Sequence, residues 1–282
     1  MKRVRTADSL FLCLLFSVLM AVAGCSGGGG GGSGSTNSDS NNSGTVLDPM
    51  ELNLLQVYTT VDTVTVHVAY EPDAEPFTGT YSTGDQFWSV LRNNLIALFD
   101  GRMILPDIFV PQTLDEMQAI LKQGQTDWTQ GQIVDLARSI WNFPQSSTTA
   151  QFYVVFVNGY YDDRGVVKKM VLGLSIPGTP VVAVFKDVIL KSGYNPLVKA
   201  ILEQTTLVHE FGHALGLVNS GVPMVTNHED IVHPHHCTNE QCVMFWENDG
   251  STLSLFIKKI IDSPSDVLFG PECLEDVVSF RP

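Results

Sequence analysis

Charge is scarce in this chain of 282 residues. Only 16% of the residues are charged, and 16 Lys and Arg face 30 Asp and Glu, which gives a formal net charge of -14. The basic residues form no dense cluster that could follow a phosphate backbone, which argues against nucleic acid as a partner. Repeats at solenoid periods are also missing. The apolar share of 44% is ample for a core, so we expect a globular body of one domain or two lobes.

The first 24 residues have the pattern of an export signal. Basic residues among the first five precede an uncharged apolar run at residues 10–23, which is too short to span a bilayer comfortably, and Val-Ala-Gly-Cys follows at residues 22–25. This ending resembles the bacterial lipobox, which is cut before a lipidated cysteine. The resemblance implies a lipoprotein signal peptide at residues 1–24 and a membrane anchor at Cys25. Ser26 favours the outer membrane, with the protein on its periplasmic or outer face.

Residues 25–45 are a Gly/Ser-rich tether. From residue 26 to residue 44 there is no apolar side chain larger than a Thr methyl, so nothing offsets the entropy cost of ordering the segment. We expect the folded domain to cover residues 46–282. Within it, we predict an N-terminal lobe at 46–218 and a small, irregular C-terminal lobe at 219–282.

The body of the chain alternates strand-like and helix-like patterns. Alternating β-branched residues and short apolar runs predict strands at residues 61–70, 152–157, 171–176 and 181–185. Apolar spacing and N-terminal capping patterns predict helices at residues 84–99, 113–116, 129–141 and 195 to 217 or 218. The residues after 218 are rich in His, Pro and Cys and are expected to be loop-like. The predicted fold class is α+β, with a mostly parallel, twisted mixed sheet in an α/β-like N-terminal lobe.

The last of these helices carries the motif His-Glu-Phe-Gly-His at residues 209–213. Residues four apart lie on one face of a helix, so His209 and His213 can reach the same ion while Glu210 projects toward a bound water. Zinc in such a site is a Lewis acid that lowers the pKa of its water, and the carboxylate is the general base. Six of the seven histidines lie at residues 209–236. We therefore predict a catalytic zinc site that supports hydrolysis.

The same helix resembles that of the metzincin zinc peptidases, which reads H-E-x-x-H-x-x-G-x-x-H and is followed by a Met-turn. Four positions match: His209, Glu210, His213 and Gly216. We expect the helix to end at Gly216, because Gly tolerates a left-handed C-cap. The archaemetzincin branch is closer still, since its H-C-x4-C-x-M pattern is reproduced at residues 236–244. The resemblance implies a metzincin-like fold, a zinc peptidase with Glu210 as general base, and Met244 packed beneath the zinc ligands.

The third zinc ligand departs from the family spacing. At the expected position this chain has Asn219, a poor zinc ligand. The family's His-Cys pair falls at residues 236 and 237, so residues 219–235 resemble an insertion and His236 is the predicted third ligand. Three other residues remain alternatives for this role: His228, His233 and Glu229.

Three cysteines remain once Cys13 is removed with the signal peptide and Cys25 is lipidated: Cys237, Cys242 and Cys273. Archaemetzincins complete a four-cysteine structural zinc site with a downstream C-x2-C pair, and here Asp276 stands at the second cysteine of that pair. The resemblance thus allows a second, structural zinc held by three cysteines and Asp276. A disulfide between two of the cysteines is the interpretation that we favour outside the cytoplasm.

Aromatic residues are further candidates for the site. Three hydroxyls could stabilise an oxyanion: Tyr160, Tyr161 and Tyr194. Two rings could form part of the pocket wall: Phe245 and Trp246. A substrate would lie against an edge strand, at residues 171–176 or 181–185.

The predicted function is that of a monomeric, lipid-anchored zinc metallopeptidase of the bacterial cell envelope, with a peptide or protein substrate. Two alternatives stay open. The first is a non-catalytic envelope binding protein with a structural zinc, against which the intact Glu210 argues, since a structural site needs no carboxylate there. The second is a zinc amidase that acts on cell-wall peptides.

Overall fold

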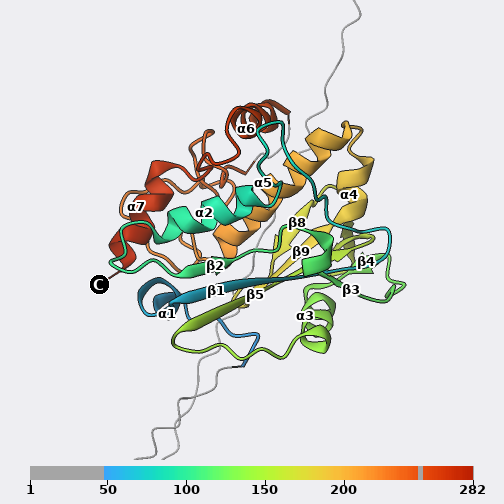
Figure 1. The fold of residues 1–282 in the computed structure, drawn as a ribbon, viewed down its shortest axis with the longest axis horizontal. Coiled ribbons are helices and arrows are strands. Elements are labelled where there is room, and N and C mark those ends of the chain that lie inside the picture. Colours follow the sequence, from blue (N-terminus) through green and yellow to red (C-terminus); the bar gives the residue numbers. More distant parts are fainter. Residues whose placement is uncertain (1–47, 247–249, 282) are drawn as a thin grey trace, which may run out of the picture. The chain divides into compact units, whose positions relative to one another are not determined.

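A mixed sheet of six strands forms the centre of the structure (Figure 1). The structure is a computed structural model that describes residues 48–246 and 250–281. The strand order is β2-β1-β5-β9-β8, and β3 also pairs with β1. The strands of this sheet are β1 (Thr63–Tyr70), β2 (Asp107–Phe109), β3 (Gln118–Ala119), β5 (Thr149–Val157), β8 (Gly173–Ser175) and β9 (Val181–Phe185). Every pair is parallel except β8 with β9, which is antiparallel.

Helices cover both faces of this sheet. In Figure 1, α2, α5 and α7 lie on one face and α3 lies on the other. The helices are α1 (Leu54–Thr59), α2 (Ser89–Phe99), the 3-10 turn η1 (Leu114–Glu116), α3 (Gln130–Ile140), α4 (Lys186–Lys191), α5 (Pro196–Ala214), α6 (Gly250–Asp262) and α7 (Pro271–Phe280). A second, three-stranded sheet consists of β4 (Asp127–Trp128), β6 (Tyr160–Asp163) and β7 (Val166–Lys168).

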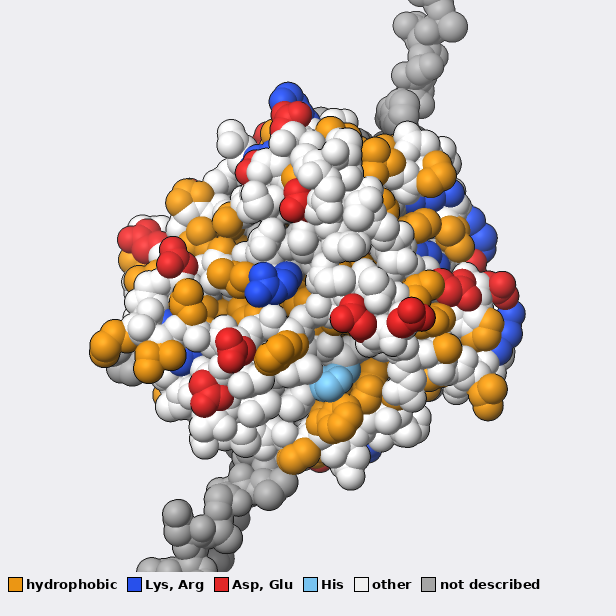
Figure 2. Space-filling view, in the orientation of Figure 1, with side chains coloured by type: hydrophobic (Ala, Val, Ile, Leu, Met, Phe, Trp, Pro, Cys, Tyr) orange, Lys and Arg blue, Asp and Glu red, His pale blue; other side chains and the backbone are white. Residues whose placement is uncertain are grey.

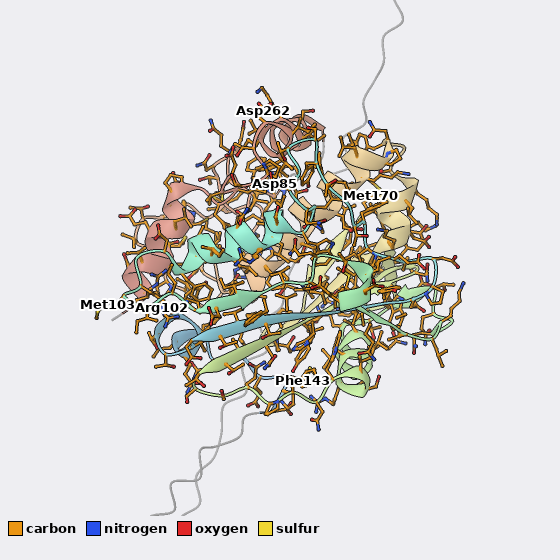
Figure 3. All side chains as sticks on the ribbon, viewed as in Figure 1. Asp85, Arg102, Met103, Phe143, Met170 and Asp262 are labelled. Carbon is orange, nitrogen blue, oxygen red and sulfur yellow. The ribbon has the colours of Figure 1, made fainter. Side chains whose placement is uncertain are left out.

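Strands β5 and β9 are buried on both faces of the sheet, as their apolar runs require. Along β5, Phe152 and Val154 join the core beneath α2 and α5, whereas Tyr153 and Val155 join the core beneath α3. This alternation follows from the period of two residues in a strand. Side chains fill both layers between sheet and helices (Figure 3). On the face in Figure 2, acidic side chains are scattered, and Lys and Arg gather mainly along the edge near α4.

Helix α5 begins where its sequence predicts but ends at Ala214, before the predicted end at residue 217 or 218. The Asn195 side chain accepts a hydrogen bond from the Val198 N–H at 3.0 Å, and Pro196 occupies the first turn. After Ala214 the chain leaves the helix, and Gly216 has φ +82°. A Cβ at Gly216 would also lie 2.5 Å from Leu54 Cδ1. The left-handed conformation and the close packing both require glycine here.

The predicted mixed α+β fold is confirmed, with three local corrections. Residues 84–88 form turns before α2, because Gly84 has φ +94°. Residues 181–185 are an inner strand between β5 and β8, so this segment is not an edge. Residues after 218 are not all loop, since they include α6 and α7. The apolar side chains that anchor these helices lie four residues apart in each: Phe256 and Ile260, Cys273 and Val277.

The predicted membrane-directed segments lie outside the described residues. These are the signal peptide at 1–24, the lipidated Cys25 and the tether at 25–45. Among the residues that the structure does describe, no helix combines the length and hydropathy needed to cross a bilayer.

Candidate metal centres

Three histidines from two segments meet at the C-terminal end of α5. His209 and His213 lie one helical turn apart, and His236 approaches them from the loop region that follows the helix. One ring nitrogen of each lies within 4.8 Å of one in both others, and the ring centroids are 4.7 to 5.2 Å apart. The structure thus places His236, the third ligand predicted from the Cys-x4-Cys-x-Met register, with the two helical histidines.

Backbone carbonyls orient two of these rings. His209 Nδ1 donates to the Val243 carbonyl at 2.7 Å, and His236 Nδ1 donates to the Pro234 carbonyl at 3.0 Å. In each ring the proton on Nδ1 leaves Nε2 with a lone pair, and His209 Nε2 lies 3.1 Å from His213 Nε2. Such outer contacts fix the tautomer and ring direction of metal ligands.

The electrostatic setting keeps the three rings neutral. Burial lowers the pKa of His209 to about 3 and lowers the pKa of His213 well below its ordinary value. Burial also lowers the pKa of His236. Neutral imidazole is the form that binds zinc, and three nitrogen ligands with one open position are typical of catalytic zinc sites. The donor set therefore fits a catalytic zinc ion.

The Glu210 carboxylate lies beside this group and contacts the edge strand. Its Oε2 accepts a hydrogen bond of 2.7 Å from the Ser175 N–H at the end of β8. Burial raises the pKa of Glu210 to about 7, and the Ser175 N–H opposes this increase. A Cβ at Gly173 would lie 3.0 Å from Glu210 Cγ, so β8 packs directly on the helix. Of the two predicted edge strands, the one at residues 171–176 thus borders the site.

Met244 is fully buried against the metal-binding helix, as the Met-turn resemblance implies. A Cβ at Gly212 would overlap Met244 Sδ and lie 3.1 Å from Phe269 Cε1. Gly212 lies between the two helical histidines, so the thioether sulfur touches the helix directly beside the three-histidine group.

The alternative third ligands lie elsewhere. His233 Nδ1 is 3.1 Å from an Asp230 oxygen, and its ring stacks on Trp246 at a centroid distance of 3.9 Å. Glu229 accepts a hydrogen bond from the His235 N–H at 2.7 Å. His228 belongs to a separate buried group with Cys237 and Cys273.

This second group brings together buried thiols and one imidazole. His228 Nδ1 lies 3.3 Å from Cys237 Sγ, and Cys242 Sγ lies 3.6 Å from Cys273 Sγ. Both Cys242 and Cys273 also make side-chain contacts with Cys237. All three cysteines are fully buried and His228 is 5% exposed. Thiolates with one imidazole are a frequent ligand set of structural zinc sites, so the donors fit a second zinc ion.

Two expectations about the cysteines are corrected. The three thiols are free, and no disulfide joins them in the described structure. Asp276 is not part of the ligand group. Its Oδ2 accepts from His228 Nε2 at 2.7 Å, and its Oδ1 accepts from the Val225 N–H at 2.7 Å. A histidine from residues 219–235 therefore stands where the sequence predicted a carboxylate ligand.

The tyrosines predicted to stabilise an oxyanion lie away from the three-histidine group. Tyr160 and Tyr161 pack with the core on the opposite face of the sheet from α5. Tyr194 precedes α5, so about 13 residues or roughly 20 Å of helix separate it from the histidines. Phe245 and Trp246, the two rings predicted for the pocket wall, are half-buried and 42% exposed respectively.

Comparisons with known proteins add one structural likeness. No family model matches the chain, and no curated protein matches it either. A zinc-dependent peptidase from Methanocorpusculum labreanum (strain Z) is similar in structure, with 12% sequence identity and a TM-score of 0.43. The similarity covers 75% of this chain and 99% of that one. The three-histidine group and the mixed fold agree with the expectations drawn from the sequence motif, whereas His228 among the cysteines departs from them.

Two contributions to the site could not be predicted from residue types. The Val243 carbonyl and the Ser175 N–H are backbone groups, so any side chain could stand at either position. The contact of His228 with Cys237 was also not predicted. The one signal in the sequence was Asp276, which stands where the archaemetzincin pattern has a cysteine.

Proposed function

We propose that this protein is a zinc-dependent peptidase whose catalytic centre is formed by His209, His213, His236 and Glu210. The observation that carries the proposal is the convergence of three neutral imidazoles beside a buried carboxylate. Bound zinc supplies a Lewis acid that polarises a carbonyl and activates water. A structural metal site has no need of the fourth group, a carboxylate held next to the three ligands.

The position of β8 supports a peptide as the substrate. Residues 172 and 176 of this segment pair with β9 through their backbone, so the N–H and carbonyl of the intervening odd-numbered residues point away from β9. An extended peptide can add to this edge through main-chain hydrogen bonds. Since the Ser175 N–H already donates to Glu210, a peptide aligned on β8 would bring its backbone next to the carboxylate.

Glu210 is the residue that moves protons in this proposal. As a carboxylate with a pKa near neutrality, it accepts a proton from the attacking water and returns it to the leaving amine. Its hydrogen bond to Ser175 fixes one oxygen and leaves the other for this transfer. His209, His213 and His236 hold the metal, and Met244 supports them from below.

We further propose that the enzyme acts at the bacterial cell envelope, held by acyl chains on Cys25. Support comes from the N-terminal sequence alone, which has the basic start, the apolar run and the lipobox-like ending. Metabolic labelling with a fatty acid tests the anchor. Label should enter the wild-type chain and not Cys25→Ser, and equal labelling of both would contradict it.

The peptidase proposal is tested by Glu210→Gln, which keeps the shape of the side chain and removes its basicity. Turnover of a denatured protein by the zinc-loaded full chain should fall by about 10²–10⁴-fold, while zinc content stays unchanged. Glu229→Gln is the matched control, because Glu229 lies near the site without joining either metal group. Equal activity of Glu210→Gln and wild type would refute the assigned role.

A further inference from the structure

The two metal centres share one short segment of chain, residues 236–244. His236 belongs to the three-histidine group and the next residue, Cys237, belongs to the cysteine group. At the other end, Cys242 precedes Val243, whose carbonyl holds His209. Each end of the segment therefore contributes to both groups through adjacent residues.

Backbone contacts tie the two ends of this segment together. The Cys237 N–H donates to the Met244 carbonyl at 2.8 Å. The Met244 N–H donates to Cys242 Sγ at 3.4 Å, and the Gly270 N–H donates to the same sulfur at 3.0 Å. Cys237 thus directly follows the ligand His236, and Cys242 directly precedes Val243, whose carbonyl holds His209, and contacts the Met244 N–H.

The cysteine group also holds residues 219–235, here called the insertion. The Thr238 N–H donates to the His228 carbonyl at 2.8 Å, while Asp276 on α7 binds both the His228 ring and the Val225 N–H. The insertion leads directly into His236. Its attachment through His228 therefore fixes the path of the chain just before the third ligand.

The archaemetzincin resemblance already implies a structural zinc at the cysteines. We propose that His228 is its fourth ligand, beside Cys237, Cys242 and Cys273, and that this ion positions His236 and the Val243 carbonyl in the first site. Asp276 is the outer partner that orients His228 through Nε2, leaving Nδ1 for the metal. The role given to the first site rests on the proposed peptidase function. The coupling of the two metals is a property of the chain that can be measured without a substrate.

The geometry excludes a nucleophilic role for the same residues. Cys237, His228 and Asp276 are connected in the order of a Cys-His-Asp triad. All three are at most 5% exposed, so no substrate carbonyl can reach the sulfur. The two further thiols against Cys237 instead complete a set of four donors, which is the number that closed structural zinc sites use.

The test measures metal binding to the full chain, purified in detergent. Wild type should bind two zinc ions, and cobalt substitution should give a thiolate-to-cobalt charge-transfer band from one of them. His228→Ala should weaken cobalt binding at this site and so reduce the band at limiting cobalt, and the zinc affinity of the three-histidine site should fall by about 10–100-fold. His235→Asn is the matched control, since it removes a histidine of the same loop outside both groups and keeps a residue that tolerates φ +67°.

Asp276→Asn is the milder variant, needed if His228→Ala does not fold. Asn can still accept the Val225 N–H, but its NH₂ faces the His228 Nε2–H and cannot accept from it. Zinc affinity should therefore fall at both sites. Unchanged affinity at the three-histidine site in a variant whose cobalt-thiolate band is reduced would overturn the coupling, and absence of that band in wild type would overturn the second site. A wild type that binds both metals but cleaves nothing would refute the peptidase and leave this proposal standing.

Discussion

Two helical glycines should respond with opposite signs to the same substitution. Glycine in a helix is less favourable than alanine by about 1 kcal/mol, so propensity alone predicts that Gly→Ala stabilises. Gly131 in α3 has open space around its Cβ position, and Gly131→Ala should raise the free energy of unfolding by about 0.5–1 kcal/mol. Gly212 in α5 is different, because a Cβ there would overlap Met244 Sδ and press on Phe269.

The packing cost at Gly212 should exceed the propensity gain. Forcing an extra methyl into a filled core costs about 1–3 kcal/mol, and Met244 is fully buried, so it cannot swing into solvent. Gly212→Ala should therefore lower the free energy of unfolding, and it should weaken zinc binding at the adjacent histidines. Met244→Ala in the same chain should relieve the overlap, so the double variant should lose less stability than the two single losses together.

Urea unfolding of the zinc-loaded chains provides the assay, with zinc content measured on the same samples. Gly131→Ala serves as the control for helix propensity. If Gly212→Ala were as stable as wild type and retained its zinc, the close packing of Met244 on the metal-binding helix would be refuted.

Three further predictions concern the ligand, a buried ion pair and acid stability. His236→Ala should lose the zinc of the three-histidine site and all turnover, while His233→Ala should keep both, and metal analysis separates them. Lys186→Met should cost about 3–5 kcal/mol in urea unfolding, because it leaves the fully buried Glu203 unpaired, and the double replacement of both by apolar residues should cost less. Burial lowers the pKa of His67, so its contribution to stability is present above pH about 6.5 and lost as pH falls through the lowered folded value. His67→Asn should therefore show a smaller acid-side loss than wild type, and equal losses would refute this.

Much of the fold followed from local patterns. The inner strands β5 and β9 are short apolar runs buried on both faces, and α5 has its cap, its first-turn proline and its terminal glycine in the sequence itself. His209, Glu210 and His213 are close in the chain, so helical geometry alone placed them together. The spacing predicts His236, because the Cys-x4-Cys-x-Met register fixes the position of Cys237, the residue that follows it.

The remainder depended on contacts between distant segments. Residue types gave no sign that the Ser175 N–H would face Glu210, because the pairing of β8 with β9 sets that direction. The sequence also did not predict the turn after α5, because Val218 there has φ +49°, a conformation that a β-branched residue rarely adopts. Val218 directly precedes the insertion that carries His228 to Cys237. The three cysteines could therefore be predicted as a group from the sequence, but the place of His228 beside them could not.

The most direct test of the central claim is digestion of a denatured protein in heavy-oxygen water, followed by mass spectrometry of the products. The zinc-loaded wild type should generate new carboxyl termini that carry one heavy oxygen, and Glu210→Gln at the same zinc content should generate none above background. New termini in equal yield from both chains, or none from a wild type whose three-histidine site is filled with zinc, would contradict a Glu210-dependent zinc peptidase.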